Sequence, residues 1–550
     1  MRFTEHLSAT PTPQTQAIIG READMVANAA GGVVFKINDW SALDRFLILG
    51  TDGGTYYVSE KKLTKDNMDV VKRCVQADGL RVVQRIVEIS VGGRAPSNDP
   101  ALLALAYAMK KGDEATRKAA AAAVPACVRI GTHLFHFVAF IELFGGWGRS
   151  TKRAIGAWYT EMYTTKLALQ LIKYKQRDGW SHRDVLRLAK PADVAGIHGE
   201  LLRYTTKGWD AIGSSAPLDP ALALVWAHEM AMVDDVSPTV LIGLITDYGL
   251  PWECVPSTVL DNKDVWNAIL HANMGMEAMI RNLPKMTQVR LLAPNSDAAK
   301  FVASRLRDEA GIKASRIHPM RILLAMKGYA AGHNIGGFGT ATWTPVTSIL
   351  DALDAAFYLS FANVEPTGKR TLIALDVSSS MTSPMAKTAL SCREASVAMA
   401  LITIASEARI GNEVEVVGYT SGLSRDWTCS TAITPLAISA RQRLDDVVRF
   451  VDTLHFGATD CALPFVWAKD QGKDFDAVIS YTDSETYAGA IQPTEALTAY
   501  RKARNINTRA IVVGMTATEY SVLDEKDAGS MNVVGFDAGV PAVMADFIRG

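Results

Sequence analysis

The sequence TLIALDVSSSM at residues 371–381 is the clearest indication of the fold in the C-terminal part of the chain. An unbroken apolar run there leads directly into a polar turn, as expected of a strand that is buried on both faces. Four similar runs follow it: EVEVVGYT (413–420), DAVISYTD (476–483), RAIVVGMT (509–516) and NVVGFD (532–537). Helical segments lie between most of these runs, the clearest at 385–408 and 439–454. Apolar strands that alternate with helices predict a parallel, doubly wound α/β domain over residues 366–550.

A different periodicity fills the chain before Pro366. Residues 28–365 consist mainly of helical segments separated by short breaks, including one expected helix at 152–173, and no fixed-period repeat is visible. From successive helices of this kind we infer a stack of HEAT-like helix pairs, with a discrete helical bundle as the alternative. Residues 1–27 are polar and contain prolines, so we expect them to form an N-terminal arm.

The composition limits the class of protein. The chain has 550 residues, 48% of them hydrophobic, and its 57 basic and 58 acidic residues give a formal charge of −1. The apolar content excludes a disordered or collagen-like chain, and the charge argues against a protein that coats nucleic acid over its whole surface. There is no CxxC pair, no segment like a signal peptide and no apolar run long enough to span a membrane. We therefore expect a cytoplasmic protein with reduced thiols.

Oxygen-bearing side chains follow three of the predicted strands and indicate a metal site. Asp376, Ser378 and Ser380 lie in the turn after the first strand, and Thr459 and Asp483 lie at two later strand ends. In a doubly wound sheet these ends converge on one edge. The three hydroxyls are expected to bind a cation directly and the two carboxylates to hold waters, a shell that suits Mg²⁺ or Mn²⁺ better than zinc. The alternative is a polar strand-to-helix turn whose serine caps the helix.

A basic and aromatic stretch lies in the helical half, between residues 149 and 190. It carries ten basic against three acidic residues, a net charge of +7. The basic residues are Arg149, Lys152, Arg153, Lys166, Lys173, Lys175, Arg177, Arg183, Arg187 and Lys190. The interleaved rings are Trp147, Trp158, Tyr159, Tyr163, Tyr174, Trp180 and His182. Cations for phosphates and flat rings for unpaired bases are what RNA binding requires.

Structural roles are the alternative for each of these residues. Trp158 and Tyr163 fit core positions, His182 fits a capping or core histidine bonded to backbone, and lysine and arginine often only solvate the outer face of a helix. A second basic cluster is more diffuse, and it fits either the opposite side of a helical array or ordinary surface. Its members are Arg281, Lys285, Arg290, Arg316, Arg321, Lys327 and His333.

Several blocks of sequence resemble one known family. NAAGGVVFKINDW and LDRFLILGTDGGTYYVSEKKL (28–63) resemble its N-terminal signature, and the central and C-terminal blocks follow in order. These are RIGTHLFHF (129–137), WGRSTKRAIGAWY (147–159), KYKQRDGWSHRDVLRL (173–188), RIHPMRILLAM, LDAAFY, VEPTGKR, DVSSSM, GATDCALP and YTDSETYAG. Together they make the chain similar to the Ro autoantigen family, of a bacterial or phage type, in which a helical TROVE module precedes a von Willebrand factor A domain.

The resemblance implies a monomeric ring of HEAT-like repeats, closed by the A domain. It also implies binding of structured small noncoding RNAs (Y RNAs) on a basic outer surface, and of single-stranded 3′ ends of misfolded or immature RNAs in the central hole, alongside exoribonucleases. The resemblance implies that the family's Y RNA contact region corresponds to Lys173, Lys175, Arg177 and His182, together with Arg149 and Arg153. On this basis His182→Ser is expected to weaken RNA binding without changing the fold.

The five metal-site residues match the adhesion-type metal site of the same family, with Ala458 where a second glycine is expected. The resulting prediction is a non-enzymatic RNA-binding protein of noncoding-RNA quality control. A metal-dependent protein-interaction scaffold is the alternative. A nuclease would need a cluster of carboxylates in the helical half, and the sequence there has none.

Overall fold

The computed structural model describes residues 11–28, 30–36, 38–49, 68–92, 95, 97–192, 194–209, 217–272, 274–335, 340–385, 388–421, 432–454, 457–484, 486–515, 520–534 and 540–549. Parts of the segments quoted above lie outside these ranges: residues 1–10 of the expected arm, 50–63 of the N-terminal block, 386–387, 516 and 535–537. Among the described residues, no helix has the length and apolar character needed to cross a membrane.

Helices dominate the chain up to residue 363. They are α1 (Asp39–Leu49), α2 (Asp69–Val91), α3 (Asp99–Lys111), α4 (Glu114–Cys127), α5 (Gly131–Leu143), α6 (Arg149–Thr160), α7 (Thr164–Lys173), α8 (His182–Ala189), α9 (Gly196–Lys207), α10 (Pro220–Ala231), α11 (Pro238–Tyr248), α12 (Lys263–His271), α13 (Met276–Arg281), α14 (Leu283–Gln288), α15 (Asp297–Arg307), α16 (Glu309–Ser315), α17 (Pro319–Ala330) and α18 (Thr347–Leu359). A short hairpin, β3 (Gln176–Arg177) with β4 (Trp180–Ser181), precedes α8.

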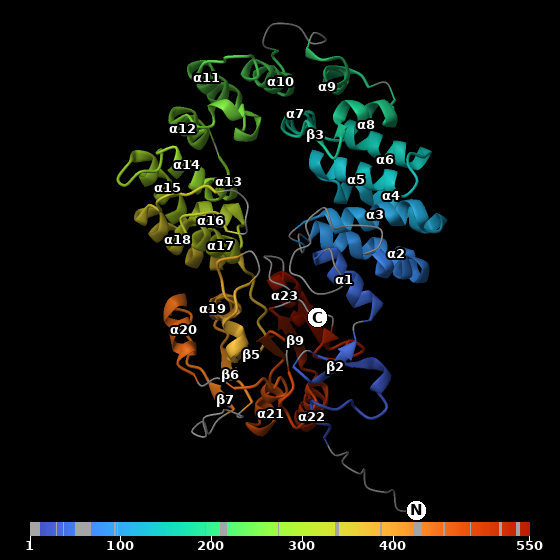
Figure 1. The fold of residues 1–550 in the computed structure, drawn as a ribbon, viewed down its shortest axis with the longest axis vertical. Coiled ribbons are helices and arrows are strands. Elements are labelled where there is room, and N and C mark those ends of the chain that lie inside the picture. The colour runs from blue at the N-terminus through green and yellow to red at the C-terminus, as the bar shows by residue number, and fades with distance from the viewer. Residues whose placement is uncertain are drawn as a thin grey trace, which may run out of the picture.

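These helices stack in two rows. In the first half of the array α2, α4, α6 and α8 pack against one another in sequence, and so do α1, α3, α5 and α7. Figure 1 shows the first row on the outside of an arch and the second row on its inner side. Successive helices therefore alternate between the rows, which confirms the HEAT-like stacking.

The helix expected over residues 152–173 is broken into two. The break falls between Thr160 and Thr164, where Tyr163 has an extended backbone (φ −54°, ψ 139°) and an 83% exposed side chain. The physical reason is tertiary: α6 packs with α4 and α8 in the outer row, whereas α7 packs with α10 and α9. Hydrophobic periodicity continues through this corner, so it does not reveal the change of direction.

The C-terminal part is a six-stranded sheet of order β11-β9-β8-β5-β6-β7. Its strands are β5 (Thr371–Asp376), β6 (Val414–Tyr419), β7 (Ile433–Pro435), β8 (Ala477–Thr482), β9 (Arg509–Gly514) and β11 (Ser530–Val534). All neighbours are parallel except the short edge strand β7, which runs antiparallel to β6. The doubly wound α/β prediction is thus confirmed, with the helix-to-sheet transition between Asn363 and Thr371.

Helices cover both faces of this sheet. They are α19 (Cys392–Ala408), α20 (Leu444–Asp452), α21 (Leu463–Asp470), α22 (Pro493–Arg504) and α23 (Val540–Arg549). Ile373 and Leu375 of β5 belong to the core that includes α19, α20 and α23, and Leu372 and Ala374 belong to the core of α21 and α22. The first of these cores continues into the helical half, so the two parts of the chain share apolar packing.

Two helices of this part begin later than the sequence pattern suggests. The helix expected from residue 385 starts at Cys392, because Ser391 forms a capping box with Glu394 that fixes the helix start. The helix expected over 439–454 extends from Leu444 to Asp452.

The N-terminal arm lies along the C-terminal part of the chain. Strands β1 (Met25–Ala27) and β2 (Val33–Lys36) form a hairpin, and β2 pairs with β10 (Tyr520–Ser521). β2, which was expected at the start of the helical domain, therefore pairs with a strand of the C-terminal unit. The sequence shows no long-range signal for this pairing, because both strands are short.

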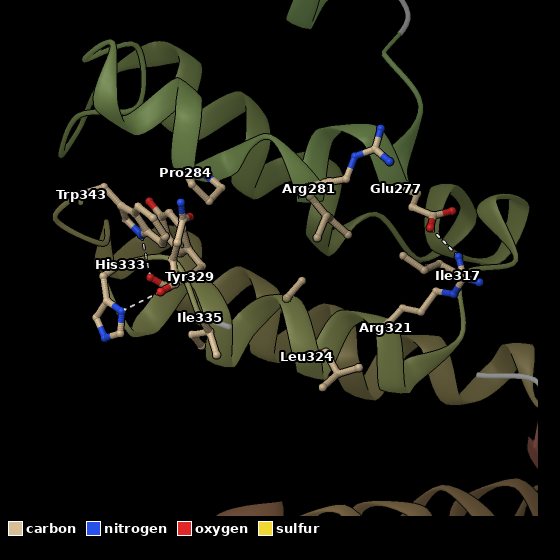
Figure 2. Close-up of a pocket in the computed structure, with 14 residues that line it drawn as sticks. Glu277, Arg281, Pro284, Ile317, Arg321, Leu324, Tyr329, His333, Ile335 and Trp343 are labelled. Atoms are coloured by element: carbon tan, nitrogen blue, oxygen red, sulfur yellow. Dashed lines mark hydrogen bonds and ion pairs between the residues drawn. The ribbon is translucent and has the colours of Figure 1, made fainter. Parts of the chain in front are cut away.

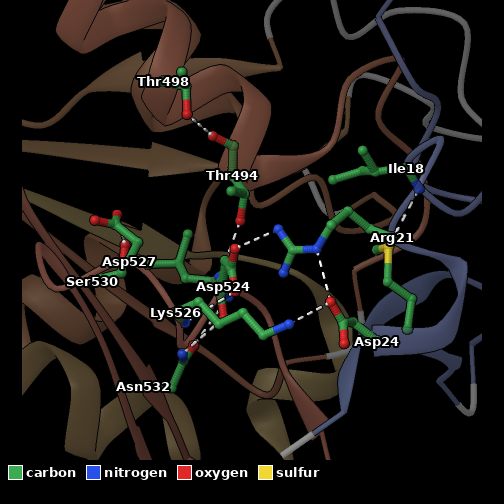
Figure 3. Close-up of polar contacts among 12 residues, drawn as sticks. Ile18, Arg21, Asp24, Thr494, Thr498, Asp524, Lys526, Asp527, Ser530 and Asn532 are labelled. Carbon is green, nitrogen blue, oxygen red and sulfur yellow. Dashed lines mark hydrogen bonds and ion pairs between the residues drawn. The ribbon is translucent and has the colours of Figure 1, made fainter.

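Polar contacts fix the arm in place (Figure 3). Arg21 Nη1 donates to Asp524 Oδ2 at 2.7 Å, and its Nε donates to Asp24 Oδ2 at 2.9 Å. Lys526 Nζ donates to the same Asp24 oxygen at 2.7 Å, and these two cations hold the pKa of Asp24 below its usual range. Next to the arm, the Asn38 backbone N–H donates to Glu525 Oε2 at 2.9 Å. Both ends of the helical arch thus meet the C-terminal unit, as Figure 1 shows.

Candidate functional site

A hydrogen bond connects the end of β5 to the neighbouring strand β8. Asp376 is 1% exposed. Its Oδ1 accepts from the Ser378 backbone N–H at 2.8 Å, and its Oδ2 accepts from Thr482 Oγ1, at the end of β8, at 2.7 Å. The hydroxyls of Ser378 and Ser380 lie 3.0 Å apart. Three predicted metal-site residues are therefore brought together, at the carboxyl end of a central strand.

Asp483 follows β8 and acts on the same carboxyl group. Burial, together with the charge of Asp483, raises the pKa of Asp376 to about 6. Asp483 is itself buried. A buried carboxylate that a second buried carboxylate makes harder to ionise marks a place where a cation would be stabilising.

Thr459 lies in the loop before α21, at the same edge of the sheet. The neighbouring Cys461 contacts Thr482, with 3.9 Å between Cys461 Sγ and Thr482 Oγ1. The Thr459 carbonyl accepts hydrogen bonds from the backbone N–H groups of Tyr487 and Ala488. These bonds fix the loop that carries the buried Thr459 side chain. The structure thus positions all five predicted residues on one edge, although no direct hydrogen bond joins Thr459 to Asp376.

The structure also explains why alanine is tolerated at position 458. Thr420 Oγ1 donates to the Ala458 carbonyl at 3.0 Å. The contact of residue 458 with Thr420 is therefore made by its backbone and does not depend on its side chain. Gly457 has a stricter requirement, since a Cβ at that position would lie 2.3 Å from Thr420 Oγ1.

Arg393 is a positioning residue that the sequence analysis missed. Its guanidinium is buried in α19, where Nη2 donates to the carbonyls of Val377 and Ser378 at 3.2 and 3.0 Å. Nη1 forms an ion pair with Asp452 at 2.6 Å. The side chain thus fixes the backbone of the turn that carries Ser378. The available signal was an arginine within the apolar run CREASVAMALI, because a buried arginine requires partners.

The donor set matches a hard divalent cation. Within the described ranges no three His, Cys, Asp or Glu side chains converge as a metal site. The oxygen groups at this edge are two carboxylates and the hydroxyls of two serines and a threonine, with no sulfur or imidazole among the predicted ligands. Mg²⁺ and Mn²⁺ prefer such oxygen ligands, and zinc prefers nitrogen and sulfur.

Exposed arginines form the basic surface in the helical half. Arg149 and Arg153 lie one turn apart on α6, and Arg183 and Arg187 lie one turn apart on α8; all four are exposed. Because α6 and α8 are adjacent in the outer row, these four side chains belong to neighbouring helices. We call these four arginines, together with the exposed Lys175 and Arg177 of the adjoining β-hairpin segment, the basic surface.

Lys173 is half-buried and has a different role. Its Nζ lies 2.9 Å from Glu253 Oε1, in the 3₁₀ turn Trp252–Cys254. Although burial alone would lower it, the hydrogen bond and charge of Glu253 raise the pKa of Lys173. Lys173, which was predicted to contact RNA, therefore joins α7 to the 3₁₀ turn that follows α11.

His182 is a core residue, and this corrects its assignment as a surface RNA contact. The side chain is 3% exposed and lies between the rings of Phe135 and Trp158, with centroids 4.7 and 5.9 Å away. Nε2 is 3.3 Å from the Gln170 carbonyl and must donate to it, so Nδ1 accepts from the Tyr159 hydroxyl at 2.8 Å. Burial lowers the pKa of His182 to about 4, which keeps the ring neutral.

The aromatic residues of the stretch separate into core and surface groups. Trp158 and Tyr159 are buried, whereas Trp147, Tyr174 and Trp180 are half-buried. Tyr163, for which a core position was the alternative, is exposed. Only some of the aromatic side chains in this stretch are thus accessible to an external ligand.

Both ends of the helical array meet an α/β domain, and the five predicted metal-site residues lie at one edge of that domain's sheet. This arrangement defines a two-module protein of the TROVE and von Willebrand factor A class. The TROVE domain model matches residues 26–212 and 249–331, and the Ro60 vWA domain model matches residues 370–548. The chain is 39% identical to the RNA-binding protein RO60 of Deinococcus radiodurans over 98% of this chain and 97% of the relative. It belongs to the Ro family.

Two further comparisons agree with this assignment. The RNA-binding protein RO60 of Caenorhabditis elegans is 36% identical, over 96% of this chain and 90% of the relative. The crystal structure of the Deinococcus radiodurans RO (RSR) protein matches with a TM-score of 0.76 at 39% identity, covering 93% of this chain and all of that chain.

Proposed function

We propose that the protein binds RNA through the basic surface on α6, α8 and the hairpin between α7 and α8. One observation carries this proposal: eight of the ten basic residues between 149 and 190 form no ion pair within the described part of the chain. They are Arg149, Lys152, Arg153, Lys166, Lys175, Arg183, Arg187 and Lys190. Unneutralised cations on adjacent helices attract a polyanion, and the names of the two relatives support RNA as that polyanion.

We further propose a role in noncoding-RNA quality control, without enzymatic activity and in the cytoplasm. In this role structured, Y-like small RNAs bind the basic surface, and single-stranded 3′ ends of misfolded or immature RNAs enter between the two sides of the arch. Exoribonucleases are the expected protein partners. The placement of the cations on the outer row supports the first mode, because an outer surface accommodates a folded RNA.

The basic surface can be tested by charge removal. Replacing Arg149, Arg153, Arg183 and Arg187 together by glutamine is expected to weaken binding of a structured RNA by about 100-fold at low salt. The slope of log K against log [salt] is expected to become shallower by about 3, since each lost phosphate contact contributes ~0.7–0.9. Filter binding across a salt series measures both quantities.

The matched control removes the same charge from other exposed positions. These are Lys263, Arg307, Lys313 and Arg441. An equal loss of affinity in both variants would show a general charge effect and would contradict a defined binding surface. If the unmodified protein carries no nucleic acid after a low-salt wash and binds none, the alternative of a metal-dependent protein-interaction scaffold is favoured.

We propose that Ser378, Ser380 and Thr459 bind Mg²⁺ or Mn²⁺ directly, with Asp376 and Asp483 holding its waters. The bound cation would supply a position for an acidic group of a partner. The buried carboxylate pair and the paired serine hydroxyls support this site. The chain's own contribution is to keep these oxygens fixed, through Thr482 on one side and Arg393 on the other.

Asp376→Ala is expected to abolish stabilisation of the protein by Mn²⁺. In the unmodified protein, free metal at 100 times its dissociation constant stabilises the folded state by about 2.7 kcal/mol, and differential scanning fluorimetry with and without Mn²⁺ detects this. Asp476→Asn is the control, because Asp476 lies before β8, at the opposite edge of the sheet, and pairs with Arg370. Persistent Mn²⁺ stabilisation of Asp376→Ala would contradict the site, and RNA affinity is expected to change little.

A further inference from the structure

A pocket of about 440 Å³ lies between α13–α14 and α17, on the side of the arch opposite the basic surface. Figure 2 shows its lining residues extending from the helices above and below. Its interior is mainly apolar, with Ile280, Ile317 and Leu324 among the lining side chains. A mixed lining of this kind, with a few polar groups, is typical of a small-ligand site.

Aromatic rings form one end of the pocket. The Tyr329 and Trp343 rings are nearly parallel, at 13°, with centroids 6.4 Å apart. Both are held in position: Trp343 Nε1 donates to the Tyr329 carbonyl at 2.8 Å, and the Tyr329 hydroxyl accepts from the Val346 backbone N–H at 3.1 Å. Trp343 is half-buried and therefore offers a fixed indole to a flat ligand.

Two arginines and a histidine border the apolar interior. Arg281, Arg321 and His333 line the pocket, and Glu277, the one carboxylate among the described lining residues, is paired with Arg321. Arg281 is 65% exposed, and its nearest acidic partner is Glu253 at 3.9 Å. The pocket thus combines an apolar, aromatic interior with an excess of positive charge, which fits a ligand that is flat at one end and anionic at the other.

Glu253 connects this pocket to the basic stretch. The same oxygen, Oε1, lies 2.9 Å from Lys173 Nζ and 3.9 Å from Arg281 Nη2. The two cationic groups are therefore less than about 7 Å apart, although α7 and α13 are about a hundred residues apart in sequence. These contacts place the end of α7 next to the mouth of the pocket.

We propose that this pocket holds one unstacked nucleotide of a single-stranded RNA, with its base in the apolar interior and its phosphate at Arg281. Bases freed from stacking are recognised by aromatic and arginine planes, and phosphates by exposed cations. The inference rests on the proposed RNA binding and assigns to single strands a site separate from the basic surface. An apolar peptide segment is the competing occupant.

Gly328 allows a direct test by filling the pocket. It lines the pocket on α17, and a Cβ there would have no atom within 4 Å. Gly328→Leu is therefore expected to fold normally and to reduce affinity for a short, fluorescein-labelled oligouridylate by about tenfold. Affinity for a hairpin RNA with a paired 3′ end is expected to stay unchanged. Gly243→Leu is the control, because Gly243 is also a glycine within a helix, α11, with open space at its Cβ.

A second variant and a crosslink make the result independent of Gly328. Arg281→Gln removes the positive charge of an exposed side chain. It is expected to make the slope of log K against log [salt] for the oligouridylate shallower by about 0.7. Photocrosslinking with 4-thiouridine is expected to label the segment around Trp343. Oligouridylate affinity unchanged in both variants, while the hairpin RNA still binds, overturns the pocket assignment alone. Absence of binding to either RNA by the unmodified protein overturns the proposed function and this inference together.

Discussion

Lowering the pH from 7 to 4.5 is expected to reduce the free energy of unfolding by several kcal/mol, through histidines kept neutral in the helical half. Burial lowers the pKa of His133, His182, His228 and His318 to about 4, from 6.5. Between these values the unfolded chain binds protons that the folded chain excludes, so stability falls as the pH falls. Each histidine contributes on the order of 2 kcal/mol by pH 4.5.

Two buried carboxyl groups act in the opposite direction. Burial raises the pKa of Asp376 to about 6 and also raises that of Asp460, so these groups take up protons in the folded state. They are fewer than the histidines, and the net effect is therefore expected to remain destabilising. The midpoint of urea unfolding, followed by circular dichroism at a series of pH values, measures it.

His228→Leu separates one histidine from the rest. In the described part of the chain neither ring nitrogen of His228 makes a full hydrogen bond, and only a weak contact with the Cys254 backbone favours its protonated form. Leucine at this position is therefore expected to leave the free energy of unfolding at pH 7 unchanged or to raise it. It is also expected to reduce by about one the number of protons taken up on unfolding at acidic pH. A midpoint equal at pH 7 and pH 4.5 in the unmodified protein would show that these histidines are protonated in the folded state.

His182→Ser is expected to lower the free energy of unfolding by about 3 kcal/mol at pH 7. Serine leaves a cavity between Phe135 and Trp158, and it removes the acceptor of the buried Tyr159 hydroxyl. A thermal or urea titration measures the loss. Any reduction of RNA affinity in this variant is then indirect, since α8, which carries Arg183 and Arg187, loses its packing.

A double-mutant cycle with Tyr159→Phe checks the reason. If the lost acceptor is responsible, Tyr159→Phe should cost less in the His182→Ser background than in the unmodified protein. A His182→Ser variant with normal unfolding and weakened RNA binding would restore His182 as a direct RNA contact. The four-arginine variant of the basic surface provides the comparison, because it removes charge without opening the core.

The fold was predictable where local pattern and packing agree. The run TLIALD is buried at every position of β5, and the same argument predicted β6, β8, β9 and β11. The metal-type edge followed from these strands, because parallel strands place their carboxyl ends together. The alternation of helices predicted stacking, but not where a helix turns from the outer to the inner row, as at Tyr163.

The candidate RNA site was less predictable, because charge and ring content do not specify burial. Arg149, Arg153, Arg183 and Arg187 lie on the surface as expected, but His182 is internal and Lys173 is paired with Glu253, a residue remote in sequence. The pocket residues Arg281, Arg321 and His333 belong to the second basic cluster, whose members are widely spaced in the sequence. They meet only because α13 and α17 pack against each other.

The pairing of β2 with β10 has a consequence for how the protein is made. Lys36 of β2 pairs with Tyr520, so β2 has only β1 beside it until the ribosome has synthesised almost the whole protein. At ~5–20 residues per second, that interval is roughly half a minute to a minute and a half. During translation the N-terminal hairpin is therefore an exposed edge, vulnerable to pairing with other nascent chains, and the arch can close only around the time of release.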